Sequence, residues 1–504
     1  MRFPSFIGGS YQSQSILADC SRTCNWYVEV MEDQGATAKA ALYPTPGVRT
    51  MSTYPLGNGR GHFAMAGREF AIIGTAFLEI NGGGQTTSRG TVALDSNPAT
   101  FSSNGDLANQ LFITSGGNGY IFALDTNTLT QITALNGKAT MGGYLDGYFL
   151  ALDADANIFY FSNLADGLTW TTGIDFAQRS LAPDPWLAMK IVGRYIWLLG
   201  ERTSEVWFDT GQTFPFAPAP SGFLSYGIAA PFSVAIIGQD PIWLAQTDTG
   251  RQCVVKCQGF TPQVISTQPL ETAFEGYNAL GAAVGDCYSD RGHTFYLLSF
   301  DRSDITWAWD LQTGLWCERG TWIAAQNKFT SWRPRFYAWA FNQHRMLDAA
   351  GGSVFQLSSN FTTDVDGLYI RRVRRAPAIN DELKRVFYSC FELDLEPGLG
   401  DARPTIANFT AEAAAIVTGT VTYDDVGGPF IWVGATVTMT VDGTPWSTTA
   451  TTDGSGIYSF GGVPAGTIGV EVTGNPGPGT RYGLNGGTAA PPATLTLDIL
   501  AQAP

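Results

Sequence analysis

The segment GGYLDGYFLALDADANIFYFSN (142–163) decides the fold of this chain, because it contains two strand-like runs joined by short turns. The run YFLAL is almost continuously apolar, whereas the run NIFYFS alternates with aromatic residues. Gly, Asn and Asp bound both runs and favour tight turns. A fully buried strand beside a half-exposed one is the pattern expected for neighbouring strands of a β-propeller blade.

Six further stretches of the chain repeat this pattern, with apolar runs such as YIWLLG and aromatic runs such as ITWAWD. These stretches are 67–80, 110–125, 189–209, 233–257, 287–310 and 337–358. They recur at irregular intervals of roughly 35–50 residues, close to the period of propeller repeats. The sequence therefore predicts an all-β fold, a β-propeller of about seven blades. A large β-sandwich or a β-helix is the alternative.

One segment, STQPLETAFEGY (266–277), has helical periodicity instead. Its apolar residues recur at i, i+3, i+4 and i+7, which places them on one face of a helix. Ser266 or Thr267 can cap its start, and Pro269 suits its first turn. We therefore expect a short helix in a connection between two blades.

The composition changes near residue 400. Residues 401–504 contain no lysine and carry eight acidic and two basic side chains. After a linker-like stretch, ANFTAEAAA (407–415), Thr- and Val-rich runs with Asp-Gly turns indicate a small antiparallel β-sandwich of the immunoglobulin-like kind. We therefore expect four parts: an N-terminal arm with strands (1–60), the propeller (61–370), a basic strand and linker (371–410), and the sandwich (411–504).

The chain as a whole is acidic, with a net charge of −15. This charge argues against a protein that grips nucleic-acid phosphates over its whole surface. RRVRRAPAINDELKR (371–385) is a local exception, and its basic side chains are Arg371, Arg372, Arg374, Arg375, Lys384 and Arg385. Alternate residues of a strand share a face, so the four arginines divide into two pairs. We name these six residues as candidates for contact with a neighbouring subunit or with DNA, the alternative being a solvated or salt-bridged strand.

No complete catalytic or metal-binding motif occurs in the sequence. The three histidines lie far apart and fit no zinc spacing, and no nucleophile elbow, P-loop or dinucleotide fingerprint is present. DADAN (153–157) begins like a calcium loop but lacks its Gly and Glu, so it predicts a hairpin turn. SNLADGLTW (162–170) resembles a single, contracted Asp-box and predicts a structural turn. We expect no enzymatic activity, no cofactor and no metal.

The cysteines and the hydropathy pattern indicate whether the chain depends on disulfides, crosses a membrane or is secreted. Seven cysteines spread over 504 residues do not form a disulfide scaffold. Cys253 and Cys257 are expected as two thiols on one buried strand face, and Cys20 could bridge to Cys24 only if the chain bends there. We expect no transmembrane helix and no secretory signal, because no sufficiently long apolar run is present and the first residues are polar.

Four stretches resemble one family, the packaged-DNA stabilisation protein, or tail hub (nozzle), of short-tailed double-stranded DNA bacteriophages. They are GRYIWLLGERTSEVWFDTGQTFPFAPAPSGFLSYGIAAPFSV (193–234), the opening GGSYQSQSILADCSRTCNWYVEV with ALYPTPGVR (8–49), LADGLTWTTGIDFAQRSLAPDP (164–185) and RVFYSCFELDLEPGLG (385–400). The likeness extends over residues 1–400.

This resemblance implies a structural virion protein of the tail, assembled in the host cytoplasm and without catalytic residues. Its fold would be a β-propeller, and six copies would form a ring below the portal and its adaptor. The ring would form the DNA exit channel, retain the packaged DNA, and anchor the tail needle, fibres or spikes. Double-stranded DNA would pass without sequence specificity, and acidic walls suit this passage because they repel phosphates.

The C-terminal part is similar to carboxypeptidase-regulatory-like, prealbumin-type domains, through TGTVTYDD, GATVTM, TTDGSGIYSF and VPAG. Some relatives of that fold form Lys–Asn isopeptide bonds, which residues 401–504 cannot form because they contain no lysine. The main alternative function for the whole chain is a propeller that binds or degrades host glycans during attachment. A soluble scaffolding propeller unrelated to phage is a further alternative.

Overall fold

The computed structural model describes two parts of the chain. The first is residues 6–376, apart from 16–18, 34, 36–37, 106–108 and 180. The second is residues 415–501, apart from 426–427, 442–443, 446–448, 464–465, 478, 490–493 and 497–498. The chain divides into two compact units, Met1–Asp401 and Ala402–Pro504, and each is described by itself.

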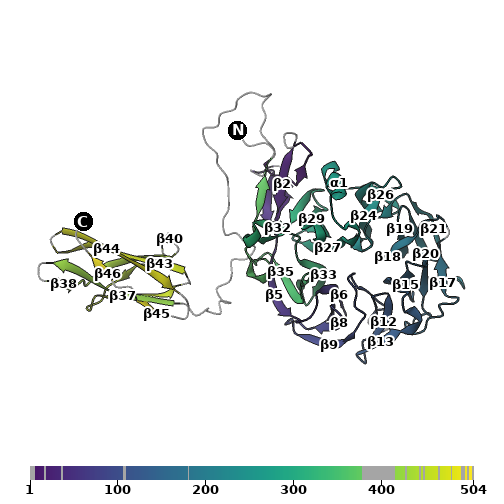
Figure 1. Ribbon diagram of the computed structural model, residues 1–504, viewed down its shortest axis with the longest axis horizontal. Coiled ribbons are helices and arrows are strands. Elements are labelled where there is room, and N and C mark those ends of the chain that lie inside the picture. The colour runs from purple at the N-terminus through teal and green to yellow at the C-terminus, as the bar shows by residue number, and fades with distance from the viewer. Residues whose placement is uncertain are drawn as a thin grey trace, which may run out of the picture. The chain divides into compact units, whose positions relative to one another are not determined.

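Seven β-sheets of the first unit are arranged in a ring (Figure 1). In these sheets most neighbouring strands follow one another in sequence and pair antiparallel. The described residues therefore build a seven-bladed β-propeller, which confirms the fold predicted from the repeated strand pattern.

We number the blades in chain order. Blades 1 and 2 are β6 (Gly59–Met65), β7 (Arg68–Ile73), β8 (Ala76–Ile80) and β9 (Thr86–Thr91), then β10 (Thr100–Ser103), β11 (Gln110–Ser115), β12 (Asn118–Ala123) and β13 (Thr128–Ile132). Blades 3 and 4 are β14 (Met141–Leu145), β15 (Tyr148–Asp153), β16 (Ile158–Phe161) and β17 (Phe176–Gln178), then β18 (Trp186–Val192), β19 (Tyr195–Gly200), β20 (Ser204–Asp209) and β21 (Phe216–Leu224). Blade 5 is β22 (Gly227–Ile228), β23 (Ala235–Ile237), β24 (Asp240–Gln246), β25 (Gln252–Gln258) and β26 (Thr261–Val264). Blades 6 and 7 are β27 (Val284–Asp290), β28 (His293–Phe300), β29 (Ile305–Asp310) and β30 (Trp316–Arg319), then β33 (Pro334–Ala340), β34 (Gln343–Asp348), β35 (Ser353–Ser358) and β5 (Gly47–Thr53).

The ring is closed by a strand from early in the chain. β5 forms the outer strand of blade 7, where Gly47 pairs with Ser358 and Val48 with Leu357. The other strands of that blade come from residues 334–358, so the last blade is completed only by chain that precedes the first. Closure of this kind leaves blades 1 and 7 packed on each other, and Ile73 and Leu347 share one buried cluster.

The near-continuous apolar runs are buried because they form the middle strands of the blades. In β7 the segment 70–73 is completely buried, and β15 and β19 are buried in the same way. Both faces of these strands contact neighbouring blades, which removes the usual alternation of apolar and polar residues. At one point the backbone of a neighbouring blade approaches a first strand still more closely: a Cβ on Gly285 of β27 would lie 1.9 Å from the carbonyl oxygen of Ser233, in the connection between β22 and β23. Glycine is needed there because no side chain fits.

The sheet of blade 6 continues beyond its fourth strand. β2 (Cys20–Cys24) joins β30 through a parallel bridge, and β1 (Tyr11–Gln12) and β36 (Val373–Arg375) both pair with β2. Two separate hairpins also belong to the first unit, β3 (Trp26–Val30) with β4 (Ala40–Pro44) and β31 (Thr321–Ile323) with β32 (Lys328–Thr330).

Helices occur only in connections within the described residues. The predicted helix is present as α1 (Gln268–Glu275), between blades 5 and 6, with Leu270 and Phe274 buried. Thr267 is its N-cap residue, but its side chain makes no capping hydrogen bond. Short 3₁₀ helices are η1 (Thr133–Leu135), η2 (Pro231–Ser233), η3 (Leu280–Ala282), η4 (Asp301–Ser303), η5 (Ala324–Gln326) and η6 (Val365–Gly367).

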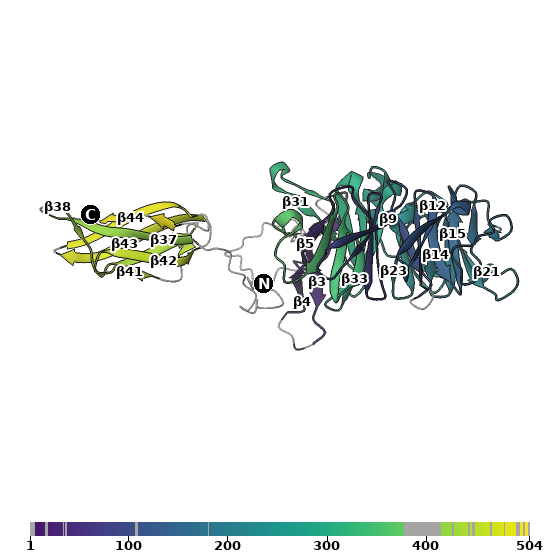
Figure 2. The same ribbon diagram turned by 90° about the horizontal axis from the view of Figure 1, so that it is seen from below.

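The second unit consists of two five-stranded sheets packed as layers (Figure 2). One sheet is β37 (Ala415–Asp425), β38 (Gly428–Ile431), β42 (Ile457–Val463), β45 (Thr494–Thr496) and β46 (Ile499–Ala501). The other is β39 (Thr436–Val441), β40 (Thr444–Pro445), β41 (Ala450–Thr451), β43 (Gly466–Gly477) and β44 (Gly479–Ala489). Tyr458 from the first sheet and Val437 and Val470 from the second share one buried core, as in a sandwich. The first sheet is mixed rather than antiparallel throughout, because β45 and β46 run parallel to β37.

Several local predictions can be compared with the structure. DADAN forms the turn between β15 and β16, and Asp153 accepts a hydrogen bond from the Ala156 N–H. In the Asp-box-like stretch, Asp166 likewise caps its own turn by accepting from the Leu168 N–H. Cys253 and Cys257 are both buried, as predicted, and burial raises the pKa of the Cys253 thiol to about 11. The described cysteines are all free thiols, Cys20 and Cys24 included.

Candidate interaction surface and polar network

The arginine cluster predicted from sequence lies on the outer edge of blade 6. β36 pairs with β2 so that Arg375 lies opposite Arg22 and Arg374 opposite Thr23. β2 in turn adjoins β30, the outermost of the four regular strands of the blade. Lys384 and Arg385, the other two predicted residues, lie outside the described residues.

Arg372 and Arg374 are half-buried and are held by the protein itself. Arg374 donates hydrogen bonds to the carbonyl oxygen of Gly9 at 3.2 Å and to Thr23 Oγ1 at 2.8 Å. It therefore ties the N-terminal segment to β2. The guanidinium of Arg372 lies 5.5 Å from the ring centre of Trp26. Burial lowers the pKa of both guanidinium groups, because desolvation penalises their charge.

Arg371 and Arg375, in contrast, are exposed. Arg371 stacks on Trp322 of β31, with its guanidinium carbon 3.8 Å from the ring centre. Close by in sequence, Phe329 of β32 lies under Arg22, whose guanidinium binds the Glu318 carboxylate at 3.0 and 2.7 Å. Cation–π stacking orders such side chains before any partner arrives. We call Arg22, Trp322, Phe329, Arg371 and Arg375 the rim surface.

The rim surface does not line the centre of the propeller. The strands at the centre are the first strands of the blades, among them β18 and β27, whereas β36 lies beyond the last strand of its sheet. Charged side chains on these first strands include Lys190 of β18 and Asp286 of β27. Burial raises the pKa of the Asp286 carboxyl to about 6, although the N–H groups of Cys287 and Tyr337 both donate to it at 2.8 Å. Enclosure lowers the pKa of Lys190, and the charge of Asp286 opposes this effect.

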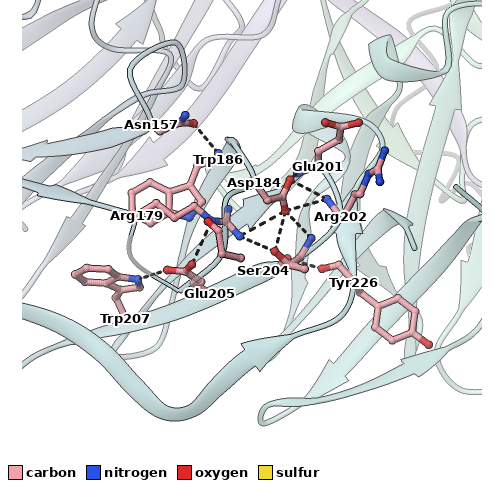
Figure 3. A network of polar contacts seen from close by, with 12 residues as sticks. Asn157, Arg179, Asp184, Trp186, Glu201, Arg202, Ser204, Glu205, Trp207 and Tyr226 are labelled. Carbon is pink, nitrogen blue, oxygen red and sulfur yellow. Dashed lines mark hydrogen bonds and ion pairs between the residues drawn. The ribbon is translucent and has the colours of Figure 1, made fainter. Parts of the chain in front are cut away.

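A second group of polar residues, not identified from the sequence, holds blades 3 and 4 together (Figure 3). Asp184 lies in the connection between β17 and β18. It accepts hydrogen bonds from the backbone N–H groups of Glu201 at 3.1 Å, Arg202 at 3.1 Å and Thr203 at 2.7 Å. One carboxylate thus fixes the whole turn between β19 and β20.

The same network contains a buried ion pair. Arg179 Nε lies 3.2 Å from Glu205 Oε1, and Trp207 Nε1 donates to the other oxygen of that carboxylate at 3.2 Å (Figure 3). Burial lowers the pKa of the Arg179 guanidinium, and the carboxylates of Glu205 and Asp184 oppose this shift. These contacts join residues of 164–185 to residues of 193–234, the two stretches on which much of the family resemblance depends. Arg179, Asp184 and Glu205 could not be singled out from sequence, because spacing alone does not place a loop carboxylate against a turn.

An Asp184→Ala variant is expected to lose about 2–3 kcal/mol of the free energy of unfolding, because several backbone donors lose a charged acceptor together. Equilibrium denaturation followed by tryptophan fluorescence measures the loss, and hydrogen exchange at residues 201–203 localises it. Asp155→Ala is the matched control, since Asp155 is exposed in the turn between β15 and β16. Equal stability of the two variants would show that Asp184 does not hold the turn.

The described residues contain no cluster of three or more side chains able to hold a metal ion. Among them there is also no helix long and apolar enough to cross a membrane. Two of the three histidines lie against carboxylates: His62 Nε2 is 2.8 Å from Glu69, and His293 Nδ1 is 2.9 Å from Asp310. The first unit is therefore a closed propeller with a basic rim surface. The polar groups described above stabilise contacts between its strands and blades.

The particular family follows from the sequence comparison. Residues 22–362 match the family described as Bacteriophage P22 Gp10, beta-propeller, and the chain belongs to that family. It is therefore a structural, DNA-stabilising protein of a bacteriophage and a component of the virion. The match ends before the second unit begins. No curated protein matches the sequence.

Several solved structures are similar to part of this chain. The N-terminal domain of Nup159 has 11% identity and a TM-score of 0.38, covering 67% of this chain and 99% of its own. The WD40 domain of Pan2 from Neurospora crassa has 10% identity and a TM-score of 0.39, covering 64% and 98%. Streptogramin B lyase has 7% identity and a TM-score of 0.40, covering 62% and 98%. At these scores the likeness says nothing about what this chain binds or does.

Proposed function

We propose that this chain is the tail hub, or nozzle, of a short-tailed phage. Copies of it would form a six-fold ring below the portal and adaptor. The ring would form the channel through which DNA leaves, retain the packaged genome, and anchor the needle, fibres or spikes. Its role would be mechanical, without a cofactor or a catalytic step.

The observation that carries the proposal is the rim surface. Two exposed arginines and two aromatic rings lie together at the outer edge of blade 6, in a chain with a net charge of −15. Arg and Trp are the residues most enriched where proteins bind one another tightly. A basic patch on an acidic protein is complementary to the remaining surface of a second copy, and such unlike-face contacts build rings. We therefore assign Arg371 and Arg375 to contact between subunits rather than to DNA.

The net charge supports the conduit role. A basic channel would hold duplex DNA by releasing its counterions, whereas acidic walls allow the duplex to slide. The second unit lies outside the family match, and we propose that it is an appended prealbumin-type domain that decorates the ring.

A cryo-EM map of the purified phage tail tests the proposal. The expected result is a closed ring of this chain around the axial DNA path, below the portal and adaptor, with Arg371 and Arg375 at the contact between copies. A peripheral position in the particle would contradict the hub assignment. Turnover of host polysaccharide by the purified chain would support the glycan-degrading alternative.

The Arg371→Glu/Arg375→Glu double variant is expected to weaken ring assembly by about tenfold or more, because two attractive contacts become repulsive. Sedimentation velocity of the full chain over a concentration series measures the assembled fraction. Arg194→Glu is the matched control, since its side chain is 81% exposed and belongs to blade 4. An unchanged assembled fraction in the double variant would exclude the rim surface from the contact between copies.

A further inference from the structure

A cavity of about 230 Å³ lies at the end of the propeller where β6, β27 and β33 begin. Its wall includes Arg60 from blade 1, Arg302 from blade 6 and Arg335 from blade 7. The cavity therefore spans the closure of the ring, where the first and last blades meet. Nothing in the proposed tail-hub function depends on it.

The charge of this cavity is opposite to that of the chain. Three arginines line it, and Asp301 is the single carboxylate among its lining residues. Asp301 is already bound to Arg335, and its side chain is 53% exposed. Arg60 and Arg335 are both 2% exposed, so their charges are held inside the protein rather than in solvent. A buried excess of positive charge is costly unless an anion accompanies it.

The hydrogen bonds of Arg60 explain its place in the wall. Its Nε donates to the Asn97 carbonyl oxygen at 3.0 Å, and its Nη1 donates to the Gly74 carbonyl oxygen at 2.9 Å. Its Nη2 donates to Ser115 Oγ at 2.9 Å. These hydrogen-bond acceptors are neutral, and the Asp95 carboxylate acts on the guanidinium only through its charge. Arg60 therefore contributes a fixed positive potential to the cavity.

Arg335 provides more direct evidence for a bound ligand. Its two terminal nitrogens bind Asp301 and the carbonyl oxygens of Trp332 and Pro334. Its Nε, in contrast, is buried and has no acceptor among the described residues. Leaving a charged donor buried without an acceptor costs free energy that a bound acceptor would recover. Arg302, which is exposed beside Asp301, can close over such an acceptor.

We propose that this cavity binds a small oxyanion of the phosphate class. The anion would accept from Arg335 Nε and Arg302, in the field of Arg60, with the side chains of Asn58 and Ser96 as neutral donors in the same wall. A volume of about 230 Å³ holds a phosphate with some water and excludes a nucleic-acid duplex. Because the ligand would contact blades 1, 6 and 7 together, it would stabilise the closed ring.

The test is thermal unfolding of the full chain in sodium phosphate against sodium chloride at equal ionic strength, with isothermal titration calorimetry using inorganic phosphate. The expected result is a saturable rise in Tm of roughly 2 °C or more, with a calorimetric Kd that matches its midpoint. Arg302→Ala is expected to weaken phosphate binding at least tenfold while the protein stays folded, because Arg302 is exposed. Arg194→Ala should leave the Kd unchanged.

Two results would overturn the proposal. One is the absence of calorimetric binding to the folded chain. The other is an equal rise in Tm for Arg302→Ala and the unaltered chain, because phosphate also stabilises proteins by general exclusion from their surface. Arg335→Gln provides a second variant: if it folds, it should lose the phosphate-dependent rise, and retention of that rise would also contradict the site.

Discussion

Replacing Arg345 with methionine is expected to lower the free energy of unfolding of the propeller by about 3–5 kcal/mol. Arg345 of β34 and Glu69 of β7 are both completely buried, and Arg345 Nη1 lies 2.5 Å from Glu69 Oε2. The other oxygen of Glu69 lies 2.8 Å from His62 Nε2. Removing the guanidinium leaves a carboxylate inside the protein without its cation, which is the costly case for a buried ion pair.

Because of the position of this ion pair, its loss is expected to destabilise the whole ring. Glu69 belongs to blade 1 and Arg345 to blade 7, so the pair crosses the closure of the ring. Arg345 also donates to the carbonyl oxygens of Asn81 at 3.0 Å and Gly82 at 2.6 Å, which lie in the turn after β8. The variant therefore loses contacts between blades 1 and 7, the two neighbouring blades that do not follow one another in the chain.

Urea denaturation followed by tryptophan fluorescence and circular dichroism measures the effect. Arg194→Met is the matched control, because the same substitution at an exposed arginine should change stability by less than about 0.5 kcal/mol. The Glu69→Gln/Arg345→Met double variant should recover part of the loss, since no buried carboxylate remains unpaired. A loss below about 1 kcal/mol in Arg345→Met would show that the pair does not stabilise closure.

The sequence predicted the parts of the fold that depend on local pattern. A run such as FAIIG is apolar because both of its faces are buried, and burial of both faces is a property of every middle strand. The helix at 266–277 and the hairpin turn at 153–157 were predicted in the same way, from periodicity and turn residues. Each of these features depends on residues that are neighbours in the chain.

The ion pairs and hydrogen bonds between blades could not be predicted, because the two partners of each are distant in sequence. Glu69 and Arg345 are 276 positions apart, and a propeller of irregular period gives no register that would align them. The arginine cluster was predicted in part. The alternation of residues along a strand predicted that Arg371 and Arg374 lie on different faces. It did not predict that Arg371 stacks on Trp322 or that Arg374 donates a hydrogen bond to Thr23. Composition showed a basic strip, and only the pairing of β36 with β2 placed it at the outer edge of a blade.

Replacing Val48 with aspartate is expected to cost at least about 4 kcal/mol and to open the ring. Val48 is 2% exposed, and its neighbours in one buried cluster include Phe355 and Leu357 of β35. Its N–H also donates to the Thr363 carbonyl oxygen at 2.7 Å. An aspartate at this position would bury a charge among apolar side chains, so we expect β5 to leave β35.

Release of β5 exposes the edge of blade 7, and an unpaired edge strand is a template for association with other chains. We therefore expect aggregation on mild heating and new proteolytic cleavage near residues 54–58, which connect β5 to β6. Val48→Ala is the graded control: it keeps the strand apolar and should cost about 2 kcal/mol, without a new cleavage site. Because every blade is held between two neighbours, loss of one joint should lower the cooperativity of unfolding of the whole ring. Unchanged protection of residues 54–58 in Val48→Asp would mean that the first and last blades stay together without β5.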